Sequence, residues 1–169
     1  MYADMGTRTG LVPNESWPAL HGKRNESRDT ARAMSEENVE IVRRAIEANR
    51  SGPPAETVEK AAELAHPDLD FVSRLSAVEG RSYRGIDGVR AYYEDLADAW
   101  QDWHNELLEV TEIGPNTVLT ESVFRGTGRS GVEVELRINI LFKLLDGRLV
   151  RMHAYPSREE ALEAAGLSE

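Results

Sequence analysis

Residues 132–144 constrain the fold more than any other segment, because every even position is apolar while the odd positions begin with Glu, Glu, Arg and Asn. The even positions are Val132, Val134, Leu136, Ile138, Ile140, Phe142 and Leu144. A period of two is typical of a β-strand that buries one face and exposes the other. Another strand pattern follows Leu145-Asp146-Gly147. The two segments therefore predict a long antiparallel hairpin.

The rest of the chain predicts helices on one side of such a sheet. Helical spacing and breakers indicate helices over 35–49, 56–65 and 87–103, and a short helix closes the chain. Strands are expected at 69–73, 105–113, 117–126, 132–145 and 148–155. The third helix carries an aromatic face made by Tyr92, Tyr93, Trp100 and Trp103. The predicted class is α+β, with a curved mixed or antiparallel sheet wrapped around three helices to form a cone with an internal pocket.

Residues 1–33 differ from the remainder in composition. They contain scattered Gly and Pro but no sustained periodicity, so we predict a disordered N-terminal extension over 1–33 and a domain over 34–169. Ser35 is the predicted cap of the first helix, with acidic residues following it. Residues 1–33 also lack the apolar core of a signal peptide.

Charge and cysteine content narrow the classes of partner. The chain has no Cys, which excludes disulfides and thiolate chemistry and fits a cytoplasmic location. A formal net charge of -10 makes general affinity for nucleic acid or for an anionic membrane unexpected. The four His residues show no metal-ligand spacing, so neither a metal nor another cofactor is expected. The remaining partners are small molecules and further copies of the chain.

Three motifs, together with the element order, carry a resemblance to a known family. They are AHPDLDF at 65–71, YRGIDGV at 83–89, and GRLVR at 147–151 leading to ALEAAGL at 161–167. With these features the chain resembles the nuclear-transport-factor-2-like superfamily over residues 35–167. The similarity is to its SnoaL-like members, relatives of ketosteroid isomerase, polyketide cyclase and limonene epoxide hydrolase. This fold hosts isomerases, cyclases, hydrolases and plain binding domains.

The resemblance also implies where catalytic groups would stand. In ketosteroid isomerase relatives an Asp base works with a Tyr and a protonated Asp; by alignment the base, the Tyr and the acid fall on Ser73, Ala45 and Ile140. The Arg and two Asp residues of the epoxide hydrolase relatives fall on Ser122, Phe124 and Ala154. Neither acid–base set is therefore present at its expected positions.

The turn at 145–147 decides which residues of the last strand face the pocket. A three-residue loop pairs Leu144 with Arg148 and turns Val150, Met152 and Ala154 inward. A two-residue turn at Asp146-Gly147 instead turns Leu149, Arg151, His153 and Tyr155 inward. We prefer the loop, because the alternative buries an Arg and a His among apolar side chains. His153 is then placed near Asn139, and Tyr155 near Arg137, on the outer face.

The predicted site is an apolar pocket that takes a small hydrophobic, oxygenated molecule. The expected activity is that of an isomerase, cyclase or hydrolase; the alternative is a non-catalytic ligand-binding or dimerisation domain. His153, Ser73 and Ser122 are the candidates for catalysis. A homodimer is expected through the outer sheet face, which offers Leu141 and Tyr155. The predicted pocket wall consists of Phe71, Ser73, Tyr92, Leu96, Trp100, Thr120, Ser122, Phe124, Leu136, Ile138, Ile140, Met152 and Ala154.

Overall fold

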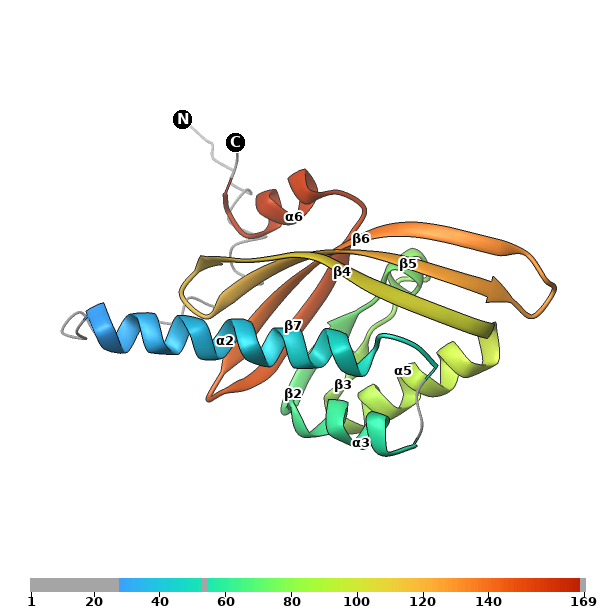
Figure 1. The fold of residues 1–169 in the computed structure, drawn as a ribbon, viewed down its shortest axis with the longest axis horizontal. Coiled ribbons are helices and arrows are strands. Elements are labelled where there is room, and N and C mark those ends of the chain that lie inside the picture. Colours follow the sequence, from blue (N-terminus) through green and yellow to red (C-terminus); the bar gives the residue numbers. More distant parts are fainter. Residues whose placement is uncertain (1–27, 53–54, 168–169) are drawn as a thin grey trace.

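A six-stranded sheet with the order β3-β2-β7-β6-β5-β4 runs through the part of the chain that the computed structural model describes, residues 28–52 and 55–167 (Figure 1). Neighbouring strands are antiparallel except β2 and β7, which are parallel. The strands are β2 Ala65–Val72, β3 Tyr83–Arg84, β4 Trp100–Gly114, β5 Thr117–Gly128, β6 Glu133–Leu145 and β7 Arg148–Tyr155. The open mixed sheet and its helices confirm the predicted α+β class.

The longer helices cover one face of the sheet, and a short helix covers part of the other (Figure 1). Helices α2 (Arg28–Ala48), α3 (Ala55–Glu63) and α5 (Gly85–Ala99) lie on the concave side. The short helix α4 (Arg74–Val78) lies between β2 and β3 in the sequence, and α6 (Arg158–Ala164) packs on β6 and β7 from the opposite side. None of the helices in 28–52 and 55–167 has the length and apolarity to cross a membrane.

The alternation of β6 divides the buried residues into two clusters. Ile140, Phe142 and Leu144 point into the main core between sheet and helices. Leu141, on the other face, packs with Leu119 beneath α6. The side chains of the two faces are thus buried against different helices, as the period of two requires.

The β6–β7 hairpin closes with the shorter of the two turns considered, so the preference for a three-residue loop was wrong. Leu145 pairs with Arg148 across Asp146 and Gly147, both of which have positive φ. This conformation is typical of tight hairpin turns. The pairing then shifts, because Leu144 pairs with Leu149 but Lys143 pairs with Arg151.

Val150 is the extra residue of this shift, and the bulge reverses the consequence of the turn. Beyond it, Met152 pairs with Phe142 and Ala154 with Ile140, so both lie on the inner face as predicted. His153 pairs with Leu141, and Tyr155 with Asn139, rather than with the predicted partners.

The third helix ends earlier than the sequence pattern predicted. It stops at Ala99, and Trp100 and Trp103 belong to β4. The Trp100 ring lies 5.0 Å from the Phe124 ring on β5. A Cβ on Gly126 would come within 2.7 Å of the Trp100 ring. The glycine therefore makes room for the indole, and this packing between strands overrides the helical spacing of the aromatic residues.

The first helix begins earlier than expected. Helix α2 starts at Arg28, so Ser35 is not its cap and the predicted boundary between 33 and 34 falls inside a helix. The remainder of the predicted extension, residues 1–27, lies outside the described residues. The short elements α4 and β3 were not predicted.

The outer face offers fewer apolar side chains to a partner than the sequence suggested. Leu141 has no exposed surface, and Tyr155 packs against the same cluster below α6. Nearby, Arg137 forms an ion pair with Glu121 at 2.9 Å. The homodimer through this face stays a prediction, and any interface on it would be largely polar.

Candidate functional site

A cavity of about 260 Å³ opens between α5, α4 and the inner face of the sheet. Most of the predicted wall lies on it, because even-numbered positions of β5 and β6, and those of β7 beyond the bulge at Val150, point toward the helices. The predicted residues that line this cavity are Phe71, Ser73, Tyr92, Leu96, Trp100, Phe124, Leu136, Ile138, Ile140 and Ala154.

Three predicted wall residues lie elsewhere. Met152 lines a smaller neighbouring cavity of about 60 Å³. Thr120 and Ser122 are fully buried and line neither of these cavities. They pair with Ile140 and Ile138 on β6, and their short side chains lie below the surface that these larger neighbours form. Ser122 therefore lacks the access that a catalytic hydroxyl needs.

Aromatic rings form two groups in the cavity wall. Phe71 and Tyr92 meet edge to face at 4.7 Å, and Tyr83 lies 5.5 Å from Tyr92. Trp100 and Phe124 form the other group. Burial raises the pKa of Tyr92 to about 12, so its hydroxyl stays protonated at neutral pH. The wall thus combines apolar ring surface with a neutral hydroxyl.

Two amide side chains, from Asn49 and Asn105, interrupt this apolar wall. The Asn49 Nδ2 lies 3.5 Å from the Tyr92 hydroxyl and donates to it. The Oδ1 atoms of both residues are buried and have no hydrogen-bond partner in the described structure. Asn105 is only 4% exposed, and its backbone N–H donates to the Arg50 carbonyl at 2.6 Å, which joins β4 to the end of α2.

Sequence reasoning did not select these amides, although one left a signal. Asn49 directly follows α2 and continues the helical spacing of the buried residues Val42 and Ile46. A polar side chain therefore occupies a position where this pattern predicts an apolar one. An amide offers both a donor and an acceptor, and its burial without a partner costs free energy. The pair is therefore a candidate for contact with a polar group of a ligand.

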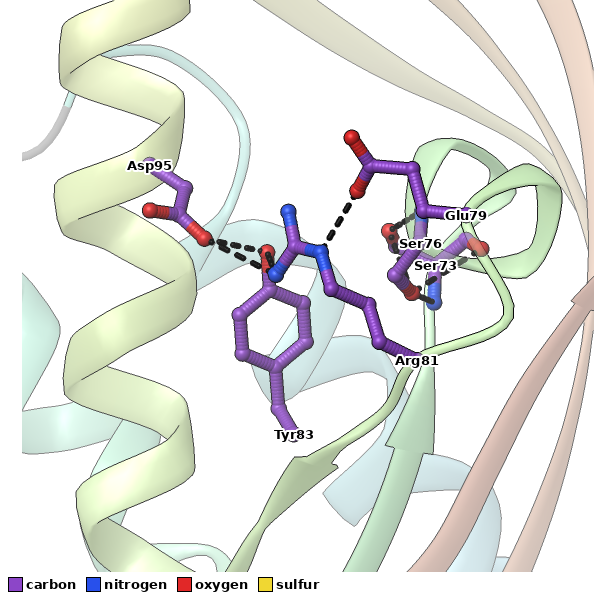
Figure 2. Close-up of polar contacts among 6 residues, drawn as sticks. All are labelled: Ser73, Ser76, Glu79, Arg81, Tyr83 and Asp95. Carbon is purple, nitrogen blue, oxygen red and sulfur yellow. Dashed lines mark hydrogen bonds and ion pairs between the residues drawn. The ribbon is translucent and has the colours of Figure 1, made fainter.

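The mouth of the cavity holds a network of charged and polar side chains, shown in Figure 2. Arg81 donates to Glu79 at 2.5 Å, to the Tyr83 hydroxyl at 3.2 Å and to Asp95 at 3.3 Å. The Tyr83 hydroxyl donates to the same Asp95 oxygen at 2.6 Å. Burial, followed by the bond to Asp95, raises the pKa of Tyr83. Arg81 and Tyr83 thus hold Asp95 in one position.

Asp95 is the one carboxylate that lines this cavity within the described residues. Its side chain is 47% exposed, so it stands between solvent and the apolar interior. Sequence reasoning missed it, although Asp95 follows Tyr92 at a spacing of three and so shares the helix face that was predicted to line the pocket.

Ser73, a candidate for catalysis, has a structural role. Its hydroxyl accepts from the Ser76 N–H at 3.0 Å, and the Ser76 hydroxyl accepts from the Ser73 N–H at 2.8 Å. This capping box starts α4. Beyond it, Leu75 and Val78 both line the cavity and are exposed by 57% and 82%. The short helix therefore forms an apolar rim.

His153 lies on the outer face and does not line the cavity. Its Nε2 is 3.0 Å from Asp70, which also pairs with Arg84 at 3.5 Å and Arg151 at 3.9 Å. Burial lowers the pKa of His153, and the bond to Asp70 opposes this effect. The predicted neighbour was Asn139; the pairing of β2 with β7 supplies Asp70 instead.

Acidic and His side chains do not gather into a metal site within 28–52 and 55–167. No group of at least three His, Cys, Asp or Glu residues is placed there to hold an ion. The polar side chains that line the cavity are amides, hydroxyls, Asp95 and Arg74, and Arg81 contacts Asp95 at the mouth.

Comparison with known proteins identifies the family. A model described as SnoaL-like domain matches residues 42–152, more than half of the chain. No curated protein matches the chain. An NTF2-like protein of unknown function from Burkholderia pseudomallei K96243 is 17% identical with a TM-score of 0.61, and the match covers 76% of this chain and 97% of that one.

Two further solved structures share the fold. TerC, co-crystallised with polyporic acid, is 17% identical with a TM-score of 0.61, over 77% of this chain and 98% of that one. An LEH-like epoxide hydrolase from M. tuberculosis is 15% identical with a TM-score of 0.57, over 77% and 90%. At these identities the likeness establishes the fold. The family model and the fold together show that the chain belongs to the SnoaL-like domain family.

Proposed function

We propose that this protein binds a small hydrophobic, oxygenated molecule in the cavity beside α5. The observation that carries the proposal is the pair of amides, Asn49 and Asn105, whose Oδ1 atoms are buried without a partner in a largely apolar and aromatic wall. Apolar surface supplies affinity without direction, whereas a few placed polar groups orient a ligand. A molecule with a hydroxyl or carbonyl group on an apolar body satisfies both parts of the wall.

The cavity size supports a ligand of about two fused rings. Ligand pockets commonly measure about 300–1,000 Å³, and the 260 Å³ found here lies just below that range. The aromatic rings of Phe71, Tyr92, Trp100 and Phe124 favour a flat, unsaturated body through stacked or edge contacts. The complex of TerC with polyporic acid supports an organic ligand in this fold.

Binding of 2-naphthol, measured by isothermal titration calorimetry, tests the proposal. We expect Asn105→Leu to weaken binding by about 2- to 12-fold, the equivalent of one hydrogen bond. Asn139→Leu is a matched control, because Asn139 is 2% exposed, also has an unpartnered Oδ1, and lies on the outer face. Absence of 2-naphthol binding to the wild-type protein, or equal losses in both variants, contradicts the proposal.

Acid–base catalysis is a second candidate function, and the position of Asp95 favours it. This carboxylate stands at the mouth, where a bound molecule meets solvent, and Tyr83 and Arg81 hold it from one side. Such a group can remove a proton from water or from a ligand carbon. The fold likeness to an epoxide hydrolase supports testing hydrolysis first.

Styrene oxide is a suitable first substrate for this candidate. We expect the wild-type protein to form the diol and Asp95→Asn to lose this activity, because the amide keeps the size of the side chain but cannot take up the proton. Both proteins should still bind 2-naphthol. Diol formation that persists in Asp95→Asn, or is absent from the wild-type protein, excludes Asp95 as a hydrolytic base.

A further inference from the structure

Arg74 differs from the other charged side chains of the cavity. It lines the cavity and is partly buried. Among the described residues it has neither an ion pair nor a hydrogen bond, whereas Asp95, the other charged group of this wall, is bound by Arg81 and Tyr83. Partial burial of a cation without a partner costs free energy, and an anionic ligand that pairs with the cation offsets this cost.

The surroundings of Arg74 define what kind of anion fits. A guanidinium presents a planar fork of donors that matches the two oxygens of a carboxylate. Glu79 and Asp95 share Arg81, so these three groups together carry one negative charge at the mouth of the cavity. A second negative charge on the ligand would therefore meet repulsion, and a monoanion is favoured over a dianion such as a phosphate ester.

The rim shows how the rest of such a ligand lies. Leu75, Val78 and Leu136 line the cavity and are exposed by 57%, 82% and 37%, so apolar surface continues from the interior to the opening. Arg74 precedes Leu75 directly on α4. A ligand with its ring system inside and its acidic group at the opening would contact both kinds of surface.

We infer that the ligand of this cavity is an amphipathic monocarboxylic acid whose carboxylate pairs with Arg74 at the mouth. The inference rests on the proposed function and narrows it, because it assigns the ligand a charge and an orientation. The ring body faces the aromatic wall, and a hydroxyl or carbonyl at the far end reaches the amide of Asn105. Arg74 acts here as a binding residue that selects anions.

Titration calorimetry of the full chain with three related probes tests this assignment. The probes are 2-naphthol, 2-naphthoate and 6-hydroxy-2-naphthoate, which carry the hydroxyl, the carboxylate, and both groups at opposite ends. We expect 2-naphthoate to bind about tenfold more tightly than 2-naphthol, since hydrogen bonds to charged groups are the stronger kind. The probe with both groups should bind most tightly.

Arg74→Gln should lower the affinity for both carboxylates about tenfold and leave 2-naphthol unchanged. Arg148→Gln is the control, because Arg148 is an exposed arginine at the β6–β7 turn. Added salt should weaken 2-naphthoate binding to the wild-type protein and have little effect on Arg74→Gln.

The outcomes separate this inference from the function on which it rests. If 2-naphthol binds but 2-naphthoate is no tighter, or if Arg74→Gln weakens all three probes equally, the assignment of Arg74 is overturned while the cavity remains a binding site. If no probe binds to the wild-type protein, the proposed function and this inference both fail.

Discussion

We expect Gly85→Ala to lower the free energy of unfolding by about 3–4 kcal/mol, because two separate costs add at this position. Gly85 has φ +64, a conformation that L side chains adopt at a cost. A Cβ there would also lie 2.8 Å from the backbone carbonyl oxygen of Pro67, which cannot rotate away as a side chain does. Urea denaturation of the wild-type and variant proteins measures the loss.

Gly80→Ala isolates the first of these costs. Gly80 has nearly the same φ, +69, but nothing lies within 4 Å of a Cβ built on it. Its replacement should cost only about 1–2 kcal/mol. Equal losses in the two variants would show that a Cβ at Gly85 meets the Pro67 carbonyl without a further cost in free energy.

Asp70→Ala should be the second severe change, with a loss of about 2–3 kcal/mol. Asp70 is 16% exposed and is shared by His153, Arg84 and Arg151. Its removal takes away the carboxylate that holds these three cationic or titratable groups at the junction of β2, β3 and β7. The expected loss of stability is smaller than for a fully buried ion pair, because water still reaches the cluster.

Asp68→Ala is the matched control on the same strand. The Asp68 side chain is 86% exposed and approaches His66 only to 3.9 Å. Its loss should stay within about 0.5 kcal/mol, as for most surface substitutions. Thermal or urea denaturation of both variants at neutral pH measures the two losses of stability. If Asp70→Ala loses no more stability than Asp68→Ala, the ion-pair cluster around Asp70 does not stabilise the fold.

The sheet could be predicted from the sequence where a local pattern reports burial directly. The alternation through 132–144 identified β6 and its inner face, because each side chain in a strand faces opposite to its neighbour. The end of α5 could not be predicted in this way. The position of Trp100 depends on Phe124 and on the missing Cβ of Gly126, and both belong to a strand further along the chain.

The candidate site, too, could be predicted only where a local sequence pattern reports burial. Ring and aliphatic residues of the cavity wall follow from the faces of β6 and α5. Arg74 and Asn105 do not, because α4 is too short for a periodic pattern and Asn105 lies in a strand with weak alternation. The contact of His153 with Asp70 joins residues 83 positions apart, and only the parallel pairing of β2 with β7 creates it.

The extra residue at Val150 has an evolutionary consequence. The turn alone would direct Arg151 and His153 into the cavity, and the bulge turns them away. If Val150 instead paired with Lys143 in a regular ladder, every residue beyond it would move by one position along β6 and the two faces of β7 would exchange there, since a shift of one residue reverses every side chain. Substitutions that remove the bulge without changing the chain length would thus replace an apolar wall by a basic, titratable one, so the hairpin gives this fold a short mutational route between binding and catalysis.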